Sequence, residues 1–253
     1  MDRAFVAPEP VVPRDPVALV TGAAKRVGRA IALELARAGH DIAIHHRASP
    51  EEAQSVAAQI RALGRRAVVV HADLVVAGEV AALFRSVDEA FGRLDVLVNC
   101  AAVFRRTPVE SLTEADFDFH VAANLKAPYL CCLEAAPRMK ASGRGCIVNI
   151  TDVAAERPFR SHVPYCVSKA GLDMLTKSLA KALAPAITVN AVAPGTVLFR
   201  DDESDDDRRR VIARIPQGRI GTPEDIARAV RFLVESPHVT GVTLAVDGGR
   251  SLD

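Results

Sequence analysis

Short apolar runs with strand character recur along the chain, and longer stretches with helical spacing separate them. The runs cover residues 17–21, 41–45, 67–71, 95–99, 145–150, 187–192 and 242–246. Runs such as 68–70 and 96–98 are apolar throughout, as expected for strands that are buried on both faces. Strands that alternate with helices are typical of a parallel sheet covered by helices. The pattern predicts one α/β domain with a doubly wound, seven-stranded parallel sheet and helices on both faces.

The 253 residues fit one domain of this class and leave a short N-terminal extension. Residues 1–16 contain four prolines and no apolar core of signal-peptide length, so we expect a flexible, proline-rich tail. The folded domain is predicted over residues 17–253. Residues 197–216 include an acidic run followed by three arginines, which indicates either a solvated helix start or a mobile lid over a substrate.

Charge and cysteine content restrict the possible partners. The chain has 32 Lys and Arg residues against 31 Asp and Glu residues, so no net field favours nucleic acid or an anionic membrane. No segment approaches the length of a membrane span. Five cysteines show no metal-binding spacing, which indicates reduced thiols, no metal site and a cytoplasmic protein. A small molecule is the expected ligand.

A glycine-containing turn follows the first apolar run and opens the first helical pattern. It reads Thr-Gly-Ala-Ala-Lys-Arg-Val-Gly over residues 21–28. A strand, a tight turn and a helix in this order direct backbone N–H groups and the positive end of a helix toward a phosphate. A plain glycine turn is the alternative. The predicted cofactor contacts in this turn are Gly22, Lys25, Arg26, Val27 and Gly28.

The end of the second apolar run indicates which dinucleotide binds. It reads His45-His46-Arg47, roughly 20 residues beyond the turn, where an enzyme specific for NAD places a carboxylate on the adenosine ribose. A carboxylate would repel a 2′-phosphate, whereas Arg47, together with Arg26 and Ser49, offers hydrogen-bond donors to one. The sequence therefore predicts NADPH as the cofactor, with ordinary surface side chains at a strand end as the alternative.

Tyr165 and Lys169 lie four residues apart within a helical pattern. This spacing places a phenol and an ammonium group on one face of the helix. A neighbouring cation favours the phenolate, so we expect it to lower the pKa of Tyr165 and to make the tyrosine a better proton donor near neutral pH. The alternative is an ordinary surface pair. The pair predicts a proton donor for a reaction in which a hydride arrives at the substrate.

Several motifs together resemble the short-chain dehydrogenase/reductase family over residues 17–253. They are the glycine turn, Asn99-Cys100-Ala101, Asn124, the Tyr165/Lys169 pair and Pro194-Gly195. The resemblance implies a Rossmann-type domain, a catalytic role for Asn124, and a homotetramer with interfaces at helices 113–140 and 164–184 and at the C-terminal strand. It also implies further cofactor contacts at Asp73, Leu74, Asn99, Ala101, Tyr165, Lys169, Pro194, Gly195 and Val197. Asp73 can instead cap a helix, and Asn99 and Asn124 can be structural.

Two positions depart from the usual pattern of this family. Arg26 stands where the turn usually has glycine, and Asp152 stands where a serine thirteen residues before the tyrosine usually binds a carbonyl oxygen. A carboxylate beside an oxygen that gains negative charge is electrostatically unfavourable, whereas a pterin ring offers N–H donors to a carboxylate. Arg26, Asp152 and Phe104, as a stacking aromatic, resemble the pteridine reductases and the bacterial dihydromonapterin reductases among them.

The sequence therefore predicts an NADPH-dependent reductase that transfers hydride to a C=N bond of a dihydropterin, such as dihydromonapterin, dihydrobiopterin or a dihydrofolate-like compound. Its predicted catalytic residues are Asn124, Asp152, Tyr165 and Lys169, and its predicted substrate contacts are Phe104, Asp152 and Tyr165. The first alternative is an NADPH-dependent carbonyl reductase of the 3-oxoacyl or sugar type, which shares every feature except Arg26, Phe104 and Asp152. The second alternative is a nucleotide-binding regulator that has lost turnover.

Overall fold

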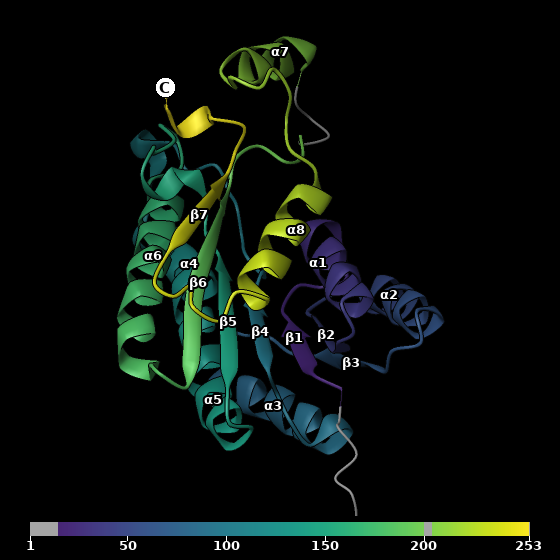
Figure 1. Ribbon diagram of the computed structural model, residues 1–253. Coiled ribbons are helices and arrows are strands. Elements are labelled where there is room, and N and C mark those ends of the chain that lie inside the picture. Colours follow the sequence, from purple (N-terminus) through teal and green to yellow (C-terminus); the bar gives the residue numbers. More distant parts are fainter. Residues whose placement is uncertain (1–14, 200–203, 253) are drawn as a thin grey trace, which may run out of the picture.

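The computed structural model describes residues 15–199 and 204–252, and among these seven strands form one parallel sheet (Figure 1). The strands are β1 (Val17–Val20), β2 (Asp41–His46), β3 (Ala67–His71), β4 (Val96–Asn99), β5 (Gly145–Ile150), β6 (Ile187–Pro194) and β7 (Thr243–Val246). Their order in the sheet is β3-β2-β1-β4-β5-β6-β7, and every neighbouring pair is parallel. The predicted sheet is confirmed. The strand order reverses between β1 and β4, where doubly wound sheets bind their ligands.

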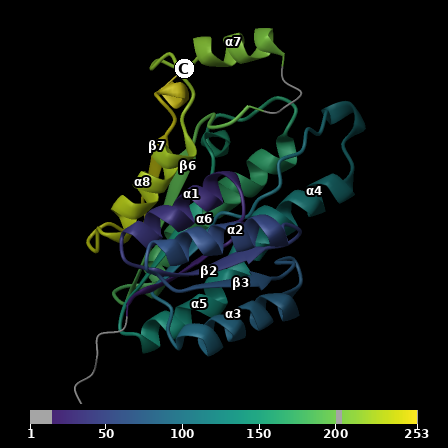
Figure 2. The ribbon, with the colours of Figure 1, turned by 90° about the vertical axis from the view of Figure 1, so that its right-hand side faces the viewer.

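Helices cover both faces of this sheet (Figure 2). They are α1 (Arg26–Arg37), α2 (Pro50–Ala62), α3 (Ala77–Phe91), α4 (Glu114–Val121), α5 (Ala127–Ala141), α6 (Val163–Leu183), α7 (Asp205–Ala213) and α8 (Pro223–Val234). The short turns are η1 (Val109–Ser111), η2 (Ala122–Lys126), η3 (Val153–Ala155) and η4 (Arg250–Leu252). Helices α1, α2 and α8 pack on one face, and α3, α5 and α6 pack on the other, with α4 against α6. No helix of the described residues is long and apolar enough to cross a membrane.

The core consists of two apolar layers, one on each side of the sheet. Neighbouring residues of a strand point to opposite faces, so Val20 packs in one layer with Ile31, while Leu19 packs in the other with Phe84. All four side chains are fully buried. Burial on both faces is the reason that these strands read as unbroken apolar runs rather than as alternating ones.

Helix α7 occupies most of the segment in which the sequence indicated either a solvated helix start or a lid. Ser204 caps it by accepting a hydrogen bond from the Asp207 N–H at 3.2 Å, and three aspartates fill its first turn. Each of these aspartates pairs with an arginine three residues later. The described part of α7 has no buried residue. The cap and the charge order therefore stabilise the start of this helix, as expected for a solvated helix start, and the lid stays a prediction.

Two of the predicted segments extend beyond the described residues. The proline-rich tail was predicted over residues 1–16, of which the structure describes only the last two. The predicted lid, residues 197–216, includes positions 200–203, which also lie outside the described residues.

Candidate active site

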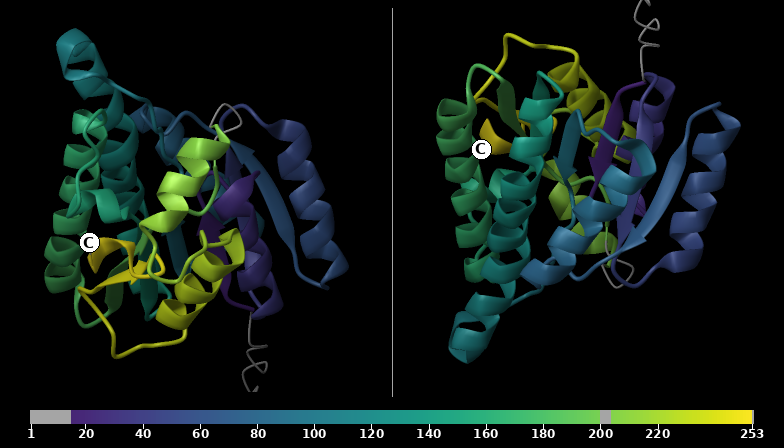
Figure 3. Two further views of the ribbon diagram at one scale, coloured as in Figure 1. Left: turned by 90° about the horizontal axis from the view of Figure 1, so that it is seen from above. Right: turned by 90° about the horizontal axis from the view of Figure 1, so that it is seen from below.

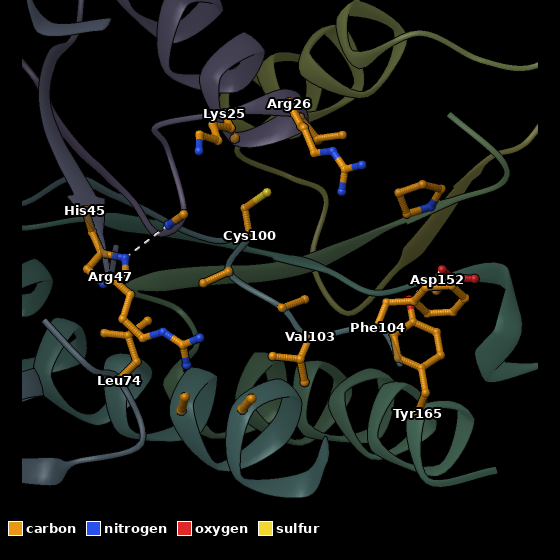
Figure 4. A pocket seen from close by; sticks show the side chains of 18 of the residues that line it. Lys25, Arg26, His45, Arg47, Leu74, Cys100, Val103, Phe104, Asp152 and Tyr165 are labelled. Carbon is orange, nitrogen blue, oxygen red and sulfur yellow. Dashed lines mark hydrogen bonds between the residues drawn. The ribbon is translucent and has the colours of Figure 1, made fainter. Parts of the chain in front are cut away.

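A cleft of about 500 Å³ opens at the carboxyl ends of the central strands (Figure 4). It brings together most of the predicted site residues: Gly22, Lys25, Arg26, Val27, Gly28, Arg47, Asp73, Leu74, Ala101, Phe104, Asp152, Tyr165, Pro194, Gly195 and Val197. Four predicted residues do not line it, namely Ser49, Asn99, Asn124 and Lys169. Asn99, Asn124 and Lys169 are buried behind the lining, and Ser49 is partly exposed beside it.

The glycine turn between β1 and α1 has the shape of a phosphate cradle. Gly22 has a φ of +65°, and a Cβ atom at Gly28 would lie 2.2 Å from the Gly22 carbonyl oxygen, so only glycine fits there. Arg26 adopts a φ of +52°, which is unusual for a residue with a side chain and accounts for the glycine that the family usually has here. Lys25, the N-cap of α1, makes no side-chain cap bond. The turn therefore fits a dinucleotide pyrophosphate.

A buried histidine, which the sequence analysis did not single out as a contact, holds this turn in place. The Gly22 N–H donates to Nδ1 of His45 at 3.0 Å, and Nε2 of His45 lies 3.0 Å from the Ala72 carbonyl oxygen (Figure 4). These partners require the neutral ring with its proton on Nε2. Burial lowers the pKa of His45 to about 4. His45 therefore contributes shape rather than positive charge, and its only sequence signal is a histidine at the end of a buried strand.

The positive charge at this end of the cleft comes from two arginines. Both the Arg26 and the Arg47 guanidinium groups reach into the cleft (Figure 4). Lys25 is also present but pairs with Glu52 at 2.7 Å. Ser49 is the N-cap of α2 without a side-chain cap bond, and its N–H donates to Nδ1 of His46 at 3.3 Å.

Asp73 and Leu74 follow β3 and line the same end of the cleft. The Asp73 carboxylate accepts a hydrogen bond from the Val75 N–H at 3.2 Å, which closes a short turn. Helix α3 begins only at Ala77, with Val76 as its N-cap. The alternative in which Asp73 caps a helix is therefore wrong.

Tyr165 and Lys169 lie on one face of α6, as their spacing predicts. The Tyr165 hydroxyl donates to Oδ2 of Asp152 at 2.7 Å. The Lys169 ammonium group donates to the Ile150 carbonyl oxygen at 2.7 Å and lies 5.8 Å from the centre of the tyrosine ring. Burial, and after it the negative charge of Asp152, raises the pKa of Tyr165 well above its usual value. This direction is opposite to the lowering that we expected from Lys169, because burial and, after it, the nearby Asp152 carboxyl group outweigh the lysine.

Asp152 caps η3 and contacts the tyrosine at the same time. One carboxyl oxygen accepts the hydrogen bond from Tyr165, and the other accepts one from the Ala154 N–H at 2.7 Å. Burial raises the pKa of Asp152, although its hydrogen bonds and the charges of Lys169 and Arg250 act in the opposite direction. Asp152 therefore takes up a proton more readily than an exposed aspartate.

Asn124 lies in η2, a π-helical turn that joins α4 to α5. Such turns are rare in proteins as a whole, but many of those that occur lie at functional sites. The Asn124 side chain accepts a hydrogen bond from the Val103 N–H at 2.8 Å and donates to the Val103 carbonyl oxygen at 3.0 Å. It also donates to Oγ of Ser168 at 3.1 Å. These contacts fasten the loop after β4 to α6, so Asn124 has the structural role that the sequence left open.

Asn99, at the end of β4, also makes structural contacts. Its side-chain amide donates to Oδ1 of Asn149 on β5 at 2.9 Å. The two N–H groups that follow it, those of Cys100 and Ala101, donate to Oγ1 of Thr21 at 2.9 and 3.0 Å. These bonds tie the end of β4 to its neighbours on both sides.

Phe104 lies beside Tyr165 (Figure 4) and contacts two further aromatic rings. Its ring stacks on His162 with 4.4 Å between centroids and an angle of 6°. It meets the Tyr165 ring edge-on at 4.7 Å and the Phe159 ring edge-on at 6.5 Å. About half of its surface remains exposed at the cleft. Phe104 therefore forms an apolar wall beside the tyrosine hydroxyl.

The sequence and the fold have close counterparts among known proteins. Residues 22–251 match a family model described as Enoyl-(Acyl carrier protein) reductase. The 3-oxoacyl-[acyl-carrier-protein] reductase FabG of Staphylococcus aureus (strain Mu50 / ATCC 700699) is 38% identical over 237 residues, which cover 92% of this chain and 96% of that protein. The protein is an oxidoreductase and belongs to the short-chain dehydrogenase/reductase family.

Two solved structures resemble the chain over almost its whole length. The structure of acetoin dehydrogenase from Enterobacter cloacae has a TM-score of 0.87 at 33% identity and covers 94% of this chain and 96% of that one. A chain from Sinorhizobium meliloti 1021, provisionally described as a short-chain alcohol dehydrogenase, has a TM-score of 0.89 at 34% identity, with coverages of 95% and 98%. A nicotinamide dinucleotide, NADH or NADPH, is the cofactor consistent with this family.

The predicted pteridine reductase activity is wrong. Full-length relatives at 38% and 37% identity are named 3-oxoacyl-[acyl-carrier-protein] reductases, and another at 34% is named a ketoacyl reductase, so their names refer to carbonyl groups. The residues that favoured a pterin over a carbonyl substrate were Arg26, Phe104 and Asp152. In the structure, Phe104 stacks on His162, and the Asp152 carboxyl group is already bonded to Tyr165 and to a backbone N–H. These contacts have local structural reasons that do not require a pterin.

Proposed function

We propose that this protein is an NADPH-dependent carbonyl reductase that converts the keto group of a 3-oxoacyl compound to an alcohol. The observation that carries the proposal is the position of the Tyr165 hydroxyl, 2.7 Å from Asp152, in a cleft that begins at a dinucleotide-shaped turn. The 38% identity to a 3-oxoacyl reductase over nearly the whole chain supports the 3-oxoacyl class over a sugar. The apolar side chains of Val103, Phe104 and Leu198 in the cleft also favour an acyl substrate.

The residues of the cleft fit the cofactor in order along its length. The turn from Gly22 to Gly28 would hold the pyrophosphate through backbone N–H groups. Arg26 and Arg47, with Ser49 beside them, would hold the 2′-phosphate that distinguishes NADPH. Asp73, Leu74 and Ala101 would flank the adenosine part, while Pro194, Gly195 and Val197 would surround the nicotinamide riboside, with Lys169 behind the lining. Bound NADPH supplies the hydride that reaches the carbonyl carbon.

The proton comes from Tyr165. As the new C–H bond forms, the carbonyl oxygen takes the hydroxyl proton and the C=O double bond becomes the C–OH group of the alcohol. The phenolate that remains is stabilised by the Lys169 ammonium group, which also bonds the Ile150 carbonyl oxygen. The substrate oxygen must therefore replace the bond between Tyr165 and Asp152.

Asp152 takes the place of the serine that most of the family has. A protonated carboxyl group can donate a hydrogen bond to the substrate oxygen, as a serine hydroxyl does, whereas an ionised one would repel the charge that develops there. Burial raises the pKa of Asp152 and so favours the protonated form. We propose that Asp152 acts on the substrate oxygen as a hydrogen-bond donor in its protonated form.

The test follows NADPH oxidation by absorbance with an acetoacetyl thioester, a 3-oxoester, acetoin and a keto sugar as parallel substrates. We expect the thioester or the ester to be reduced best, and kcat/KM to be at least about tenfold higher with NADPH than with NADH. Tyr165→Phe should abolish turnover while cofactor binding, measured by calorimetry, is retained. Cofactor binding without reduction of any ketone by the wild type would refute the proposal and favour the nucleotide-binding regulator.

The quaternary structure and the location complete the proposal. A homotetramer is supported by exposed apolar side chains on the two helical segments predicted as interfaces, Phe117, Tyr129 and Leu133 on α4 and α5, and Val167 and Met174 on α6. The small-molecule substrate and the cytoplasmic location predicted from the sequence are retained. Residues 17–253 are taken as one domain, with α7 in the position of a substrate lid.

A further inference from the structure

A second cleft, of about 510 Å³, lies close to the active site, and its charged lining consists of arginines. Arg157 follows η3, Arg214 is the C-cap of α7, and Arg250 begins η4. Val153, Pro158 and Phe159 complete the lining. We call it the arginine cleft. Figure 1 shows α7 and the C-terminal end at the same end of the molecule, and the view from above in Figure 3 shows them near each other.

No carboxylate of the described residues forms a salt bridge with any of these three arginines. Arg157 donates to the Ser251 carbonyl oxygen at 3.0 Å, and Arg250 donates to the Val211 carbonyl oxygen at 3.3 Å. Both of these partners are neutral backbone carbonyl groups. Arginines 208–210 of α7 behave differently, because each pairs with an aspartate of the same helix. Glu156 is adjacent to Arg157 in sequence, but its negative charge acts on Lys177 of α6, where it helps to raise the pKa of the lysine.

The arginine cleft adjoins the active site through two pairs of residues. Phe159 lines the arginine cleft and meets Phe104 of the active-site cleft edge-on at 6.5 Å. Val153 lines the arginine cleft and directly follows Asp152, which lines the active-site cleft. Arg250 is close enough to Asp152 for its charge to act on that carboxyl group. The linings of the two clefts are therefore in contact through the side chains of Phe104 and Phe159.

We propose that the arginine cleft binds a phosphate or carboxylate group on the tail of the ketone substrate. This inference rests on the proposed carbonyl reductase and adds that the preferred substrate is an anion. Guanidinium groups bind both kinds of oxyanion through paired N–H donors. Arg157 and Arg214 are exposed, so each contributes little alone, and selectivity comes from three cations around one small space.

Kinetics with substrates that differ only in the anion test this assignment. The acetoacetyl thioesters of pantetheine and of 4′-phosphopantetheine differ by one phosphate, and the dimethyl and monomethyl esters of 3-oxoadipate differ by one carboxylate. We expect the wild type to have a kcat/KM at least tenfold higher for the anionic member of one pair. A preference within the first pair identifies a phosphate as the group bound, and a preference within the second identifies a carboxylate.

Substitutions then connect the preference to the arginine cleft. The double variant Arg157→Gln/Arg214→Gln removes two cations at exposed positions and leaves Arg250 in place because Arg250 influences Asp152. We expect the anionic-to-neutral ratio of kcat/KM to fall at least tenfold in this variant. Arg144→Gln is the matched control, because Arg144 is exposed and precedes the amino end of β5, whereas the arginine cleft lies beyond the carboxyl end of that strand, and its ratio should equal that of the wild type. Circular dichroism checks that all variants fold.

Binding without turnover separates this inference from the proposed function. Calorimetry with 4′-phosphopantetheine, pantetheine and monomethyl and dimethyl succinate measures anion binding even if no ketone is reduced. Absence of ketone reduction by the wild type would refute the proposed function, while tighter binding of an anionic probe, lost in the double variant, would still support the arginine cleft. Equal binding and equal kcat/KM within both pairs, or an anion preference unchanged by the double substitution, would overturn it.

Discussion

The replacement of Asp152 by serine is the sharpest test of the proposed chemistry. In the resting enzyme the Asp152 carboxyl group accepts the Tyr165 hydroxyl at 2.7 Å, and burial raises its pKa. The protonated form can donate to the substrate oxygen, and the ionised form cannot. Serine supplies a donor that does not titrate in the accessible pH range. Asp152→Ser therefore keeps a hydrogen-bond donor at this position and removes the pH dependence of that donor.

The sign of the pH effect follows from the direction of the shift. Because the pKa of Asp152 in the folded protein is raised, the carboxyl group stays protonated to a higher pH than an exposed aspartate does. Activity should be high below that pKa and fall as the pH rises through it. Removing one hydrogen-bond donor to a developing oxyanion typically costs about 10²–10³ in rate, and a partly solvated cleft reduces this to about 10–100-fold. We therefore expect the kcat/KM of the wild type to decrease by about 10–100-fold as the pH rises through the pKa of Asp152.

The assay is a pH profile of kcat/KM with a neutral 3-oxoester for the wild type and for Asp152→Ser. The kcat/KM of the wild type should fall as the pH rises through the pKa of Asp152, and Asp152→Ser should show no such fall and exceed the wild type above that pKa. Asp152→Asn, which also carries a donor that does not titrate, should show no such fall either. A flat wild-type profile, or a serine variant that is less active at every pH, would refute the assignment of a protonated Asp152.

Three further predictions concern the cofactor, the histidine under the turn and the quaternary structure. Arg47→Asp should narrow or reverse the preference for NADPH in kcat/KM, because it replaces a donor to the 2′-phosphate by a repelling charge; equal use of both cofactors by the wild type would contradict this. His45 has a folded pKa of about 4 against 6.5 for the free ring, so between these pH values the unfolded chain binds more protons and stability falls as the pH is lowered. Urea denaturation of the wild type between pH 7 and pH 4 should include a loss of about 3 kcal/mol from this histidine, and His45→Asn should lack that share; an unchanged pH dependence would exclude this role. Met174→Glu, at an exposed apolar position of α6, should lower the mass measured by light scattering if this face joins subunits, and a monomeric wild type would refute the tetramer.

The sequence by itself determined the framework of this protein. Seven apolar runs predicted seven strands, and all were found in one parallel sheet because strands buried on both faces leave a local signal in every residue. The glycine turn could also be predicted, because Gly22 and Gly28 meet steric demands of the adjacent backbone. The common face of Tyr165 and Lys169 follows from helix geometry alone. These are consequences of residues close together in the chain.

The choice of partner for each side chain was decided only by the tertiary structure. His45 was not singled out in the sequence, but packing buries it under the glycine turn, and its bonds to Gly22 and Ala72 require the neutral ring. Lys169 was expected to set the pKa of Tyr165, but the loop after β5 brings the Asp152 carboxyl group nearer. Similarly, the substrate class could not be derived from Phe104 and Asp152, because the structure gives both side chains other local partners.

The three arginines of the arginine cleft show most clearly what could not be predicted from the sequence. Arg157, Arg214 and Arg250 belong to three segments with no shared motif, and they surround one space only because α7 and the C-terminal turn fold back over the end of the sheet. Periodicity reports which face of an element is buried, since that depends on neighbours three or four residues away. It carries no information about which elements meet at their ends. That is decided by the global packing, and with it the electrostatics of the site.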